Sequence, residues 1–362
     1  MKNLYLGVLL APYRLDYYNY IHDNMNCDVY FQLKSSEGNL FSTEELERKC
    51  TFIPKYLDIM KVFGVRQVVW NLRRLIKESN PQFIMVPEFS ILTIEVILIK
   101  KIYGYKYKII SQCDDSYAML VGKGFSRVHS WARKLCMRYL DDLILLDKKA
   151  RDWYQKHYHK GIWMPLIVDS NKIDKDLIIE AKAKAAQLKE LYSLQTVKTL
   201  LFVGRLIDFK NLFSLIDACV LLKFPHKLII VGDGVQRKDL EKYAANKNAN
   251  VEFVGRKNGV ELTAWYYCAD LFVLPSKIEA FGAVTNEALL CGCNCCISQV
   301  AGSTCLIEEG VNGYLLDPDN VNDIADKITT ACNLSVDKDR TSKMIYDFTQ
   351  KIDAMSKKII SL

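Results

Sequence analysis

The sequence predicts two doubly wound α/β domains in series, each a parallel β-sheet with helices on both faces. Three observations support this. The chain has 362 residues, more than one ordinary hydrophobic core accommodates. Short apolar runs alternate with segments of helical periodicity, which is typical of parallel sheets. The alternation breaks once, near Trp163-Met164-Pro165, and then begins again.

The first half contains four apolar runs of strand length, separated by helical patterns. We expect strands at residues 4–10, 83–86, 108–111 and 143–146, and helices at 44–48, 68–78, 90–102 and 126–140. Because the apolar runs show no polar alternation, each strand should be buried on both faces. The first domain is expected to cover residues 1–165.

The second half repeats this pattern after a helix of high propensity at residues 178–192. We expect strands at 199–203, 227–231, 251–254, 271–274 and 294–297, and helices at 212–222, 237–246, 261–268, 283–290 and 321–332. This second domain should cover residues 166–339. A last helical segment is expected at about 339–360.

Composition and charge narrow the class of protein. Half of the residues are apolar and a quarter are charged, as in folded, water-soluble proteins. The net charge of +7 comes from residues 1–178, which hold 27 Lys and Arg against 20 Asp and Glu, whereas residues 179–362 are balanced. A basic half can face anionic lipid, nucleic acid or a phosphorylated substrate, or can simply be a solvated surface. Nucleic acid is the weakest of these, because it would need clustered aromatics and cations.

The twelve cysteines and the apolar N-terminus predict a cytoplasmic protein. The cluster Cys291, Cys293, Cys295 and Cys296 lacks the second pair or the histidines of a zinc site, so we expect reduced core thiols and no metal. Residues 1–13 are apolar, but no small-residue cleavage site follows, which favours a first β-strand over a signal peptide. No apolar stretch approaches about 18 residues, the length of a membrane span.

The first chemical motif, at residues 200–211, is a buried strand that runs into Gly204 and Arg205, with Lys210 just before a helix. Glycine allows the backbone close approach to a ligand. Two cations at a strand–helix junction suit a diphosphate.

Two weaker glycine turns follow later strands. Gly232-Asp233-Gly234 does not complete a dinucleotide fingerprint, and its simplest interpretation is a tight strand–helix turn. Gly255 and Arg256 end another strand, where the backbone could meet the edge of a nucleobase.

The fourth motif is the sharpest. Glu279 and Glu287 flank the segment Ala280-Phe281-Gly282-Ala283-Val284, where a helix is expected to start. The N–H groups of Gly282, Ala283 and Val284 would then form an anion site at the positive end of the helix. Each carboxylate can accept from two neighbouring hydroxyls, which suits a sugar. The alternative is two surface glutamates at chance spacing.

Taken together, the four motifs resemble the C-terminal domain of family 4 retaining glycosyltransferases, which have the GT-B fold. A small-Gly-Cys stretch at residues 291–293 and an N-G-x-L segment at 312–318 extend the resemblance, which covers about residues 199–320. It implies two Rossmann-like domains with a cleft between them. It also implies that a C-terminal helix, at about 340–362, returns to the first domain.

The resemblance implies roles for particular residues. Arg205 and Lys210 would bind the donor diphosphate, Glu287 the ribose and Glu279 the transferred sugar. Gly204, Gly232 and the backbone at 280–284 would line the donor site, with Gly255 and Arg256 beside the base. The helix end and the cations would replace a metal ion, because no Asp-x-Asp motif is evident. No cofactor is expected beyond the UDP- or GDP-sugar substrate.

The first half departs from the family pattern. The segment after its first strand lacks the glycine-rich loop, and the segment after residue 111 lacks the histidine that relatives carry. Asp114 or Asp115 could bind the acceptor hydroxyl instead, or could cap the next helix, which is the commoner role of Asp. Arg14 could contact an acceptor or a phosphate.

Basic stretches at 100–108 and 123–138 lie where relatives touch membranes, and Arg127, Lys134 and Arg138 could share one helix face. A solvated face is the alternative. The expected function is retaining, metal-independent transfer of a hexose (enzyme class EC 2.4) to a glycan or lipid-linked acceptor, in cell-surface polysaccharide or lipopolysaccharide assembly. The alternatives are an inactive nucleotide-sugar-binding or membrane scaffold, and a GT-B-like nucleotide-sugar epimerase. Base, sugar, acceptor, linkage and oligomeric state stay open.

Overall fold

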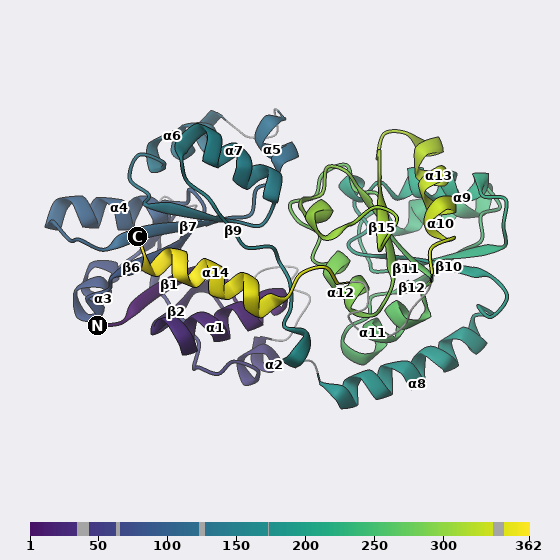
Figure 1. The fold of residues 1–362 in the computed structure, drawn as a ribbon, viewed down its shortest axis with the longest axis horizontal. Coiled ribbons are helices and arrows are strands. Elements are labelled where there is room, and N and C mark those ends of the chain that lie inside the picture. The colour runs from purple at the N-terminus through teal and green to yellow at the C-terminus, as the bar shows by residue number, and fades with distance from the viewer. Residues whose placement is uncertain (35–42, 63–65, 123–126, 173, 336–343) are drawn as a thin grey trace. The chain divides into compact units, whose positions relative to one another are not determined.

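The computed structural model describes residues 1–34, 43–62, 66–122, 127–172, 174–335 and 344–362 (Figure 1). The chain forms two compact units. Unit 1 contains Met1–Val168 and Phe348–Leu362, and unit 2 contains Asp169–Asp347. Each unit is described by itself.

Unit 1 is built on a parallel sheet in the order β3-β2-β1-β6-β7-β8-β9. Its strands are β1 (Asn3–Leu9), β2 (Cys27–Leu33), β3 (Lys55–Tyr56), β6 (Phe83–Pro87), β7 (Lys108–Cys113), β8 (Asp142–Leu145) and β9 (Ile162–Trp163). The central strands are buried on both faces, and an antiparallel hairpin of β4 (Ile59–Val62) and β5 (Arg66–Val69) lies beside them. Each crossover between parallel strands is longer than a hairpin turn, as this topology requires.

Helices cover both faces of this sheet. They are α1 (Leu15–Met25), α2 (Thr43–Arg48), α3 (Leu72–Ser79), α4 (Ile91–Tyr103), α5 (Tyr117–Val121), α6 (Arg127–Cys136) and α7 (Lys148–Tyr158). Side chains from α3, α4, α6 and α7 share one apolar core with the strands. Local chemistry sets the ends of α4, because Ser90 caps its first turn and Gly104 adopts the left-handed conformation after its last.

The last helix, α14 (Phe348–Ile360), belongs to unit 1 and packs beside α1 (Figure 1). Ile352, Met355 and Ile359 are buried there. Asp353 accepts from the Tyr20 hydroxyl at 2.5 Å, and the Lys358 ammonium donates to the Gly161 carbonyl at 3.1 Å. The chain therefore returns to its first unit, as the sequence predicted.

Unit 2 contains a second parallel sheet in the order β12-β11-β10-β13-β14-β15. The strands are β10 (Lys198–Val203), β11 (His226–Val231), β12 (Val251–Gly255), β13 (Leu271–Leu274), β14 (Asn294–Ser298) and β15 (Gly313–Leu316). The helices are α8 (Lys175–Leu191), α9 (Leu212–Leu221), α10 (Arg237–Asn246), α11 (Gly259–Cys268), α12 (Val284–Leu290) and α13 (Val321–Ala331). Both sheets have the doubly wound α/β arrangement that the alternating pattern predicted.

Two predicted helices are wrong in extent. Residues 68–69 pair with Ile59 and Met60 in the β4–β5 hairpin, so the helix expected at 68–78 begins only at Leu72. The helix expected from 339 begins at Phe348. Residues 339–343 lie outside the described residues. Residues 344–347 are not helical and belong to unit 2, where the Asn286 amide donates to the Met344 sulfur at 3.5 Å. The sequence analysis also missed α1, α7, β2 and β15.

The predicted zinc-free cysteine cluster lies in the core of unit 2. Cys291, Cys293, Cys295 and Cys296 are buried, and the Cys293 thiol donates to the Tyr266 carbonyl at 2.9 Å. Among the described residues there is no group of His, Cys, Asp and Glu side chains arranged to hold a metal ion. None of the described helices combines the length and the apolar character that a membrane span needs.

Candidate functional site

The loops that follow three neighbouring strands of unit 2 are bonded to one another through their backbones. After β10, the Gly204 N–H donates to the Val231 carbonyl at 3.0 Å. After β11, the Gly232 N–H donates to the Gly255 carbonyl at 2.9 Å. Because carboxyl ends of parallel strands meet at one edge of a sheet, the predicted motifs converge there.

Glycine is required in the β11 loop because two backbones touch. A Cβ atom on Gly232 would lie 1.8 Å from the Gly204 carbonyl oxygen, and one on Gly234 would lie 2.4 Å from that of Leu206. Both distances are far below a van der Waals contact. The turn that looked unspecific in the sequence therefore holds the β10 loop, with Arg205, in place.

Lys210 and Glu279 form an ion pair in this edge. Lys210 ends the short 3₁₀ turn η3 (Asp208–Lys210), and its ammonium donates to the Glu279 carboxylate. Their side chains are only 15% and 13% exposed. The buried Ser276 hydroxyl donates to the same carboxylate oxygen at 3.2 Å. The two residues that the sequence placed 69 positions apart are thus direct neighbours.

Asn211 holds the Lys210 loop against two others. It is buried and left-handed, with φ 58°. Its side-chain amide donates to the Pro275 carbonyl at 3.2 Å and to the Pro318 carbonyl at 2.7 Å. These bonds fix the chain that carries Lys210 to the start of the Glu279 loop. The N-G-x-L segment that the sequence singled out supplies one of the anchors through Pro318.

The loop from Glu279 into α12 is built on two glycines. Gly282 has φ 91°, and a Cβ atom there would lie 2.8 Å from Leu274. A Cβ atom on Gly302 would lie 2.3 Å from the Ala280 carbonyl oxygen. Among the described residues, no group accepts from the N–H groups of Gly282, Ala283 and Val284. These three donors lie at the start of α12, whose N-cap is Ala283 and whose first residue is Val284, and this is the helix start that the sequence predicted.

Glu287 lies on α12 and accepts from the Tyr266 hydroxyl at 2.8 Å. Burial raises the pKa of the Glu287 carboxyl, and the hydrogen bond from Tyr266 partly offsets that effect. Tyr266 thus orients one carboxylate oxygen. Sequence reasoning missed Tyr266, since nothing in the local pattern of α11 marks it.

Arg205 and Arg256 differ from Lys210 in being exposed. Neither takes part in an ion pair with another described residue. The edge of unit 2 therefore offers exposed guanidinium groups, a partly buried lysine–glutamate pair and three N–H donors. Such a set can bind an anionic group and hydroxyls together.

In unit 1, Arg14 and Asp114 meet although they are 100 residues apart. Arg14 ends the 3₁₀ turn η1 (Pro12–Arg14) after β1, and Asp114 follows β7. The Arg14 guanidinium donates to the Asp114 carboxylate at 2.5 Å. Burial disfavours the charge on Arg14, but the carboxylate of Asp114 outweighs that effect and raises the pKa of Arg14. The structure thus joins two of the three acceptor-side residues predicted.

Asp115 points into a different environment. It is 4% exposed and accepts from the Cys113 thiol at 3.2 Å. Burial raises the pKa of Asp115, and the nearby charges of His129 and Arg133 act in the opposite direction. Asp115 is therefore compensated from α6, and His129 supplies an imidazole that the sequence search did not find after β7.

The alternative that Asp114 or Asp115 caps the next helix is wrong. The cap of α5 is Ser116, whose hydroxyl accepts from the Met119 N–H at 3.4 Å. Asp147 reaches the same turn and accepts from the Tyr117 N–H at 2.7 Å. Because Ser116 and Asp147 accept from the N–H groups of Met119 and Tyr117, neither Asp114 nor Asp115 is needed as the cap of α5.

Glu88 is a residue of this edge that sequence reasoning missed. It follows β6 in a left-handed conformation, with φ 46°. Burial, reinforced by the charges of Asp114 and Asp115, raises the pKa of Glu88 to about 7. A glutamate directly after a buried strand was the available signal, since the carboxyl ends of strands carry the ligand-binding residues.

Comparison with known proteins identifies the class first. Residues 184–348, nearly all of unit 2, match the family model described as "Glycosyl transferases group 1". This match confirms the resemblance found in the motifs. The fold is GT-B: solved structures of this class superpose on the whole chain, whereas membership of family 4 itself stays a prediction.

Particular relatives are similar over part of their length. A sulfoquinovosyl transferase of Arabidopsis thaliana is 32% identical over 42% of this chain and 30% of its own. A GDP-mannose-dependent alpha-mannosyltransferase of Corynebacterium glutamicum is 35% identical over 40% of this chain and 32% of its own. The chain thus matches about a third of the length of these curated relatives.

Two solved structures share the fold at low identity. Anabaena HepE in complex with UDP covers 100% of both chains with a TM-score of 0.76 and 16% identity. The apo form of the lipopolysaccharide outer core galactosyltransferase WaaB covers 100% of this chain and 99% of its own, with a TM-score of 0.74 and 16% identity.

Proposed function

We propose that the protein is a retaining glycosyltransferase that moves a hexose from a UDP- or GDP-sugar to an acceptor hydroxyl without a metal ion. The observation that carries this proposal is the Lys210–Glu279 pair beside the N–H donors of residues 282–284, inside the segment that matches the family. Relatives named for glycosyl transfer, and a structural neighbour that binds UDP, support it.

Different residues of the donor site bind different parts of the nucleotide-sugar. Arg205 and Lys210 neutralise the diphosphate, and the N–H groups of Gly282 and Ala283 donate to its oxygens. Glu279 accepts from hydroxyls of the transferred sugar and Glu287 from the ribose. Gly204, Gly232 and Gly255 let the backbone approach, with Arg256 beside the base.

The reaction exchanges one bond at the anomeric carbon. The bond from that carbon to the donor diphosphate breaks, and the diphosphate leaves with the electron pair. The acceptor oxygen bonds to the carbon on the same face, and its proton passes to a diphosphate oxygen. Arg205 and Lys210 stabilise the negative charge that develops on the leaving group. In unit 1, Arg14 and Asp114 bind the acceptor.

The setting that we propose is cell-surface polysaccharide or lipopolysaccharide assembly on the inner face of the cell membrane. The support is a mixed surface on unit 1. Ile102 on α4 and Trp131 on α6 are 68% and 62% exposed, and Lys134 and Arg138 are exposed close by in sequence. Such a surface suits peripheral contact with an anionic bilayer. The side chain of Arg127, and residues 123–126 of the predicted basic stretch, lie outside the described residues.

A thermal-shift panel with UDP, GDP, ADP and CMP in the presence of EDTA tests the donor site. We expect one of the diphosphates UDP and GDP to stabilise the protein, by about 2.7 kcal/mol at a hundredfold excess over its dissociation constant. Arg205→Ala and Lys210→Ala should abolish the shift, whereas the exposed Lys223→Ala should keep it. No shift with any nucleotide would remove the donor site and leave the scaffold alternative.

Turnover tests the reaction itself. Glu279→Ala should keep nucleotide binding and lose transfer, because a sugar contact is removed while the diphosphate contacts stay. Release of free nucleotide only when an acceptor is supplied supports transfer. Interconversion of two nucleotide-sugars without an acceptor would identify an epimerase instead.

A further inference from the structure

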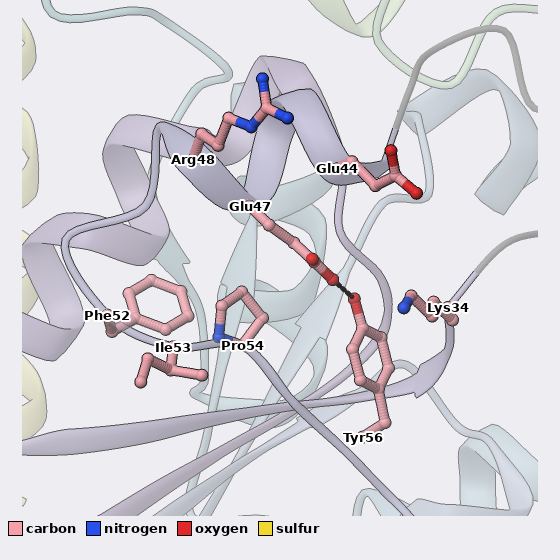
Figure 2. A pocket seen from close by; sticks show the side chains of 8 residues that line it. All are labelled: Lys34, Glu44, Glu47, Arg48, Phe52, Ile53, Pro54 and Tyr56. Carbon is pink, nitrogen blue, oxygen red and sulfur yellow. Dashed lines mark hydrogen bonds between the residues drawn. The ribbon is translucent and has the colours of Figure 1, made fainter.

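A cavity of about 580 Å³ lies in unit 1 between α2 and the chain that leads into β3 (Figure 2). It is separate from the Arg14–Asp114 pair and has no assigned role. Its volume is in the range of small-ligand sites. The cavity is open to solvent, and the chemistry of its two unlike walls decides which ligand fits.

One wall is apolar and held in place. It consists of Phe52, Ile53 and Pro54, at the start of the segment that enters β3. Phe52 is buried, and its ring centroid lies 5.1 Å from that of His22 on α1, with the two ring planes tilted by 34°. Ile53, in contrast, is 86% exposed, so an apolar surface faces solvent at the mouth.

The other wall is polar and contains Lys34, Glu47 and Tyr56. The Tyr56 hydroxyl donates to one oxygen of the Glu47 carboxylate at 2.6 Å (Figure 2). Burial raises the pKa of Tyr56, so its hydroxyl stays protonated and keeps donating. Lys34 points toward this pair in the same view, so a carboxylate oxygen, a phenol and an ammonium gather on one side.

The formal charges of the lining cancel, since Lys34 and Arg48 are matched by Glu44 and Glu47. A phosphate would lack the excess of cations that usually binds it. An alkyl chain would strip water from Glu47 and Lys34 without replacing their hydrogen bonds. A sugar ring fits both walls, because its apolar C–H face can pack on the apolar wall while its neutral hydroxyls form hydrogen bonds with the polar wall.

The polar wall of the cavity lies toward the edge of the sheet that carries Arg14, whereas Phe52, Ile53 and Pro54 precede β3 and lie toward the opposite edge. Lys34 directly follows β2, whose Leu33 pairs in register with Leu9 at the end of β1. Arg14 comes after β1, so both lie toward the carboxyl edge of the sheet. In the sheet order β3 is two strands from β1, which is about 10 Å at the usual strand spacing.

We propose that this cavity is a saccharide subsite that binds a neutral sugar unit of the acceptor next to the one that reacts. The subsite rests on the proposed transferase function for its role, but its binding is measurable without turnover. Phe52, Ile53 and Pro54 receive the C–H face of the ring, and Glu47 and Lys34 bind its hydroxyls. The acceptor is accordingly an oligosaccharide or a glycoside with at least two sugar units.

Saturation-transfer NMR on the full chain tests the proposal with maltose, lactose, cellobiose, chitobiose and mannobiose as probes. We expect at least one disaccharide to bind. Tyr56→Phe and Glu47→Gln should each weaken that binding about tenfold. The first removes the hydroxyl that orients the Glu47 carboxylate, and the second removes the charge that strengthens its hydrogen bonds to the sugar. The matched control is Glu78→Gln. Glu78 lines a neighbouring cavity that shares Tyr56, so its substitution should leave disaccharide binding unchanged.

The outcomes separate the two proposals. Disaccharide binding that depends on Tyr56 and Glu47 supports the subsite even if no nucleotide shifts the melting temperature. A nucleotide shift without disaccharide binding overturns the subsite and leaves the transferase. Equal losses in the Glu78→Gln control, or competition by inorganic phosphate, also overturn it. Circular dichroism spectra and melting temperatures equal to those of the wild type will show that Tyr56→Phe and Glu47→Gln are folded.

Discussion

At the scale of single residues, Glu88 shows how the fold can hold a residue in a left-handed backbone conformation with its carboxyl group partly buried. Its left-handed backbone is pinned by three hydrogen bonds. The N–H donates to Gln112 at 2.8 Å, and the carbonyl accepts from Ser111 at 2.7 Å and from Thr93 at 3.1 Å. These bonds compensate the cost of about 1–2 kcal/mol that a residue with a Cβ atom meets in this conformation.

The raised pKa of Glu88 makes stability depend on pH. The folded state binds the proton more tightly than the unfolded chain, because the pKa rises from 4.5 to about 7. The contribution of Glu88 to the free energy of unfolding is therefore full below about pH 4.5 and falls as the pH rises through 7. We expect Glu88→Gln to gain stability relative to the wild type between pH 5 and pH 8, measured by urea unfolding.

The control for that series is Glu190→Gln, which changes an exposed carboxylate on α8. Its difference from the wild type should stay flat across the same pH range. A flat difference for Glu88→Gln as well would show that burial and the charges of Asp114 and Asp115 do not raise the pKa of Glu88.

At the scale of elements, the donor edge depends on the contact between the β10 and β11 loops. Two glycines allow the backbones to touch, and no side chain could replace them without moving a loop. The loops carry Arg205 on one side and lead into α10 on the other. The contact between the β10 and β11 loops therefore positions a residue of the donor site, Arg205, in addition to stabilising the fold.

We expect Gly232→Ala to lower the free energy of unfolding by about 3 kcal/mol or more. The added Cβ would lie 1.8 Å from the Gly204 carbonyl oxygen, so overpacking adds to the backbone strain at φ 145°. Guanidinium unfolding measures this loss, and nucleotide binding should weaken with it.

The matched variant is Gly104→Ala, where the glycine has φ 69° but a Cβ would meet nothing within 4 Å. Only the backbone cost of about 1–2 kcal/mol should appear there. Equal losses in the two variants would mean that the loop contact contributes nothing.

At the scale of the whole molecule, unit 1 combines the N-terminal part of the chain with the C-terminal helix α14. The helix α14 adds buried side chains to unit 1, and this buried face meets α1. A change near the C-terminus should therefore affect the first unit and spare the donor residues of the second.

Met355→Ala tests this arrangement. Met355 is 1% exposed, so the truncation should cost about 2–5 kcal/mol of stability. Ile360→Ala, at a residue 66% exposed on the same helix, should cost under about 0.5 kcal/mol. Calorimetry should show the loss while the nucleotide shift persists. A Met355→Ala variant as stable as Ile360→Ala would argue against this packing.

Much of the architecture could be predicted from the sequence, because periodicity and strand-end motifs are local. The central strands from β6 to β8 and from β10 to β14 lie within a few residues of their predicted ranges. The short edge strands and α1 were missed because their patterns are brief or rich in aromatic and polar residues. The false helix at 68–69 arose because two valines are compatible with either structure until a partner strand is known.

The sequence by itself determined the GT-B fold class and the resemblance of the second unit to glycosyl transferases, since buried parallel strands and strand-end glycines leave a readable pattern. Only the tertiary structure decided which side chains meet. It paired Lys210 with Glu279 and Arg14 with Asp114, turned Asp115 toward α6, and added Glu88 and Tyr266. The reason is that electrostatics and hydrogen bonding depend on distance in space, and residues separated by about 70 or 100 positions become neighbours only when the strand ends align.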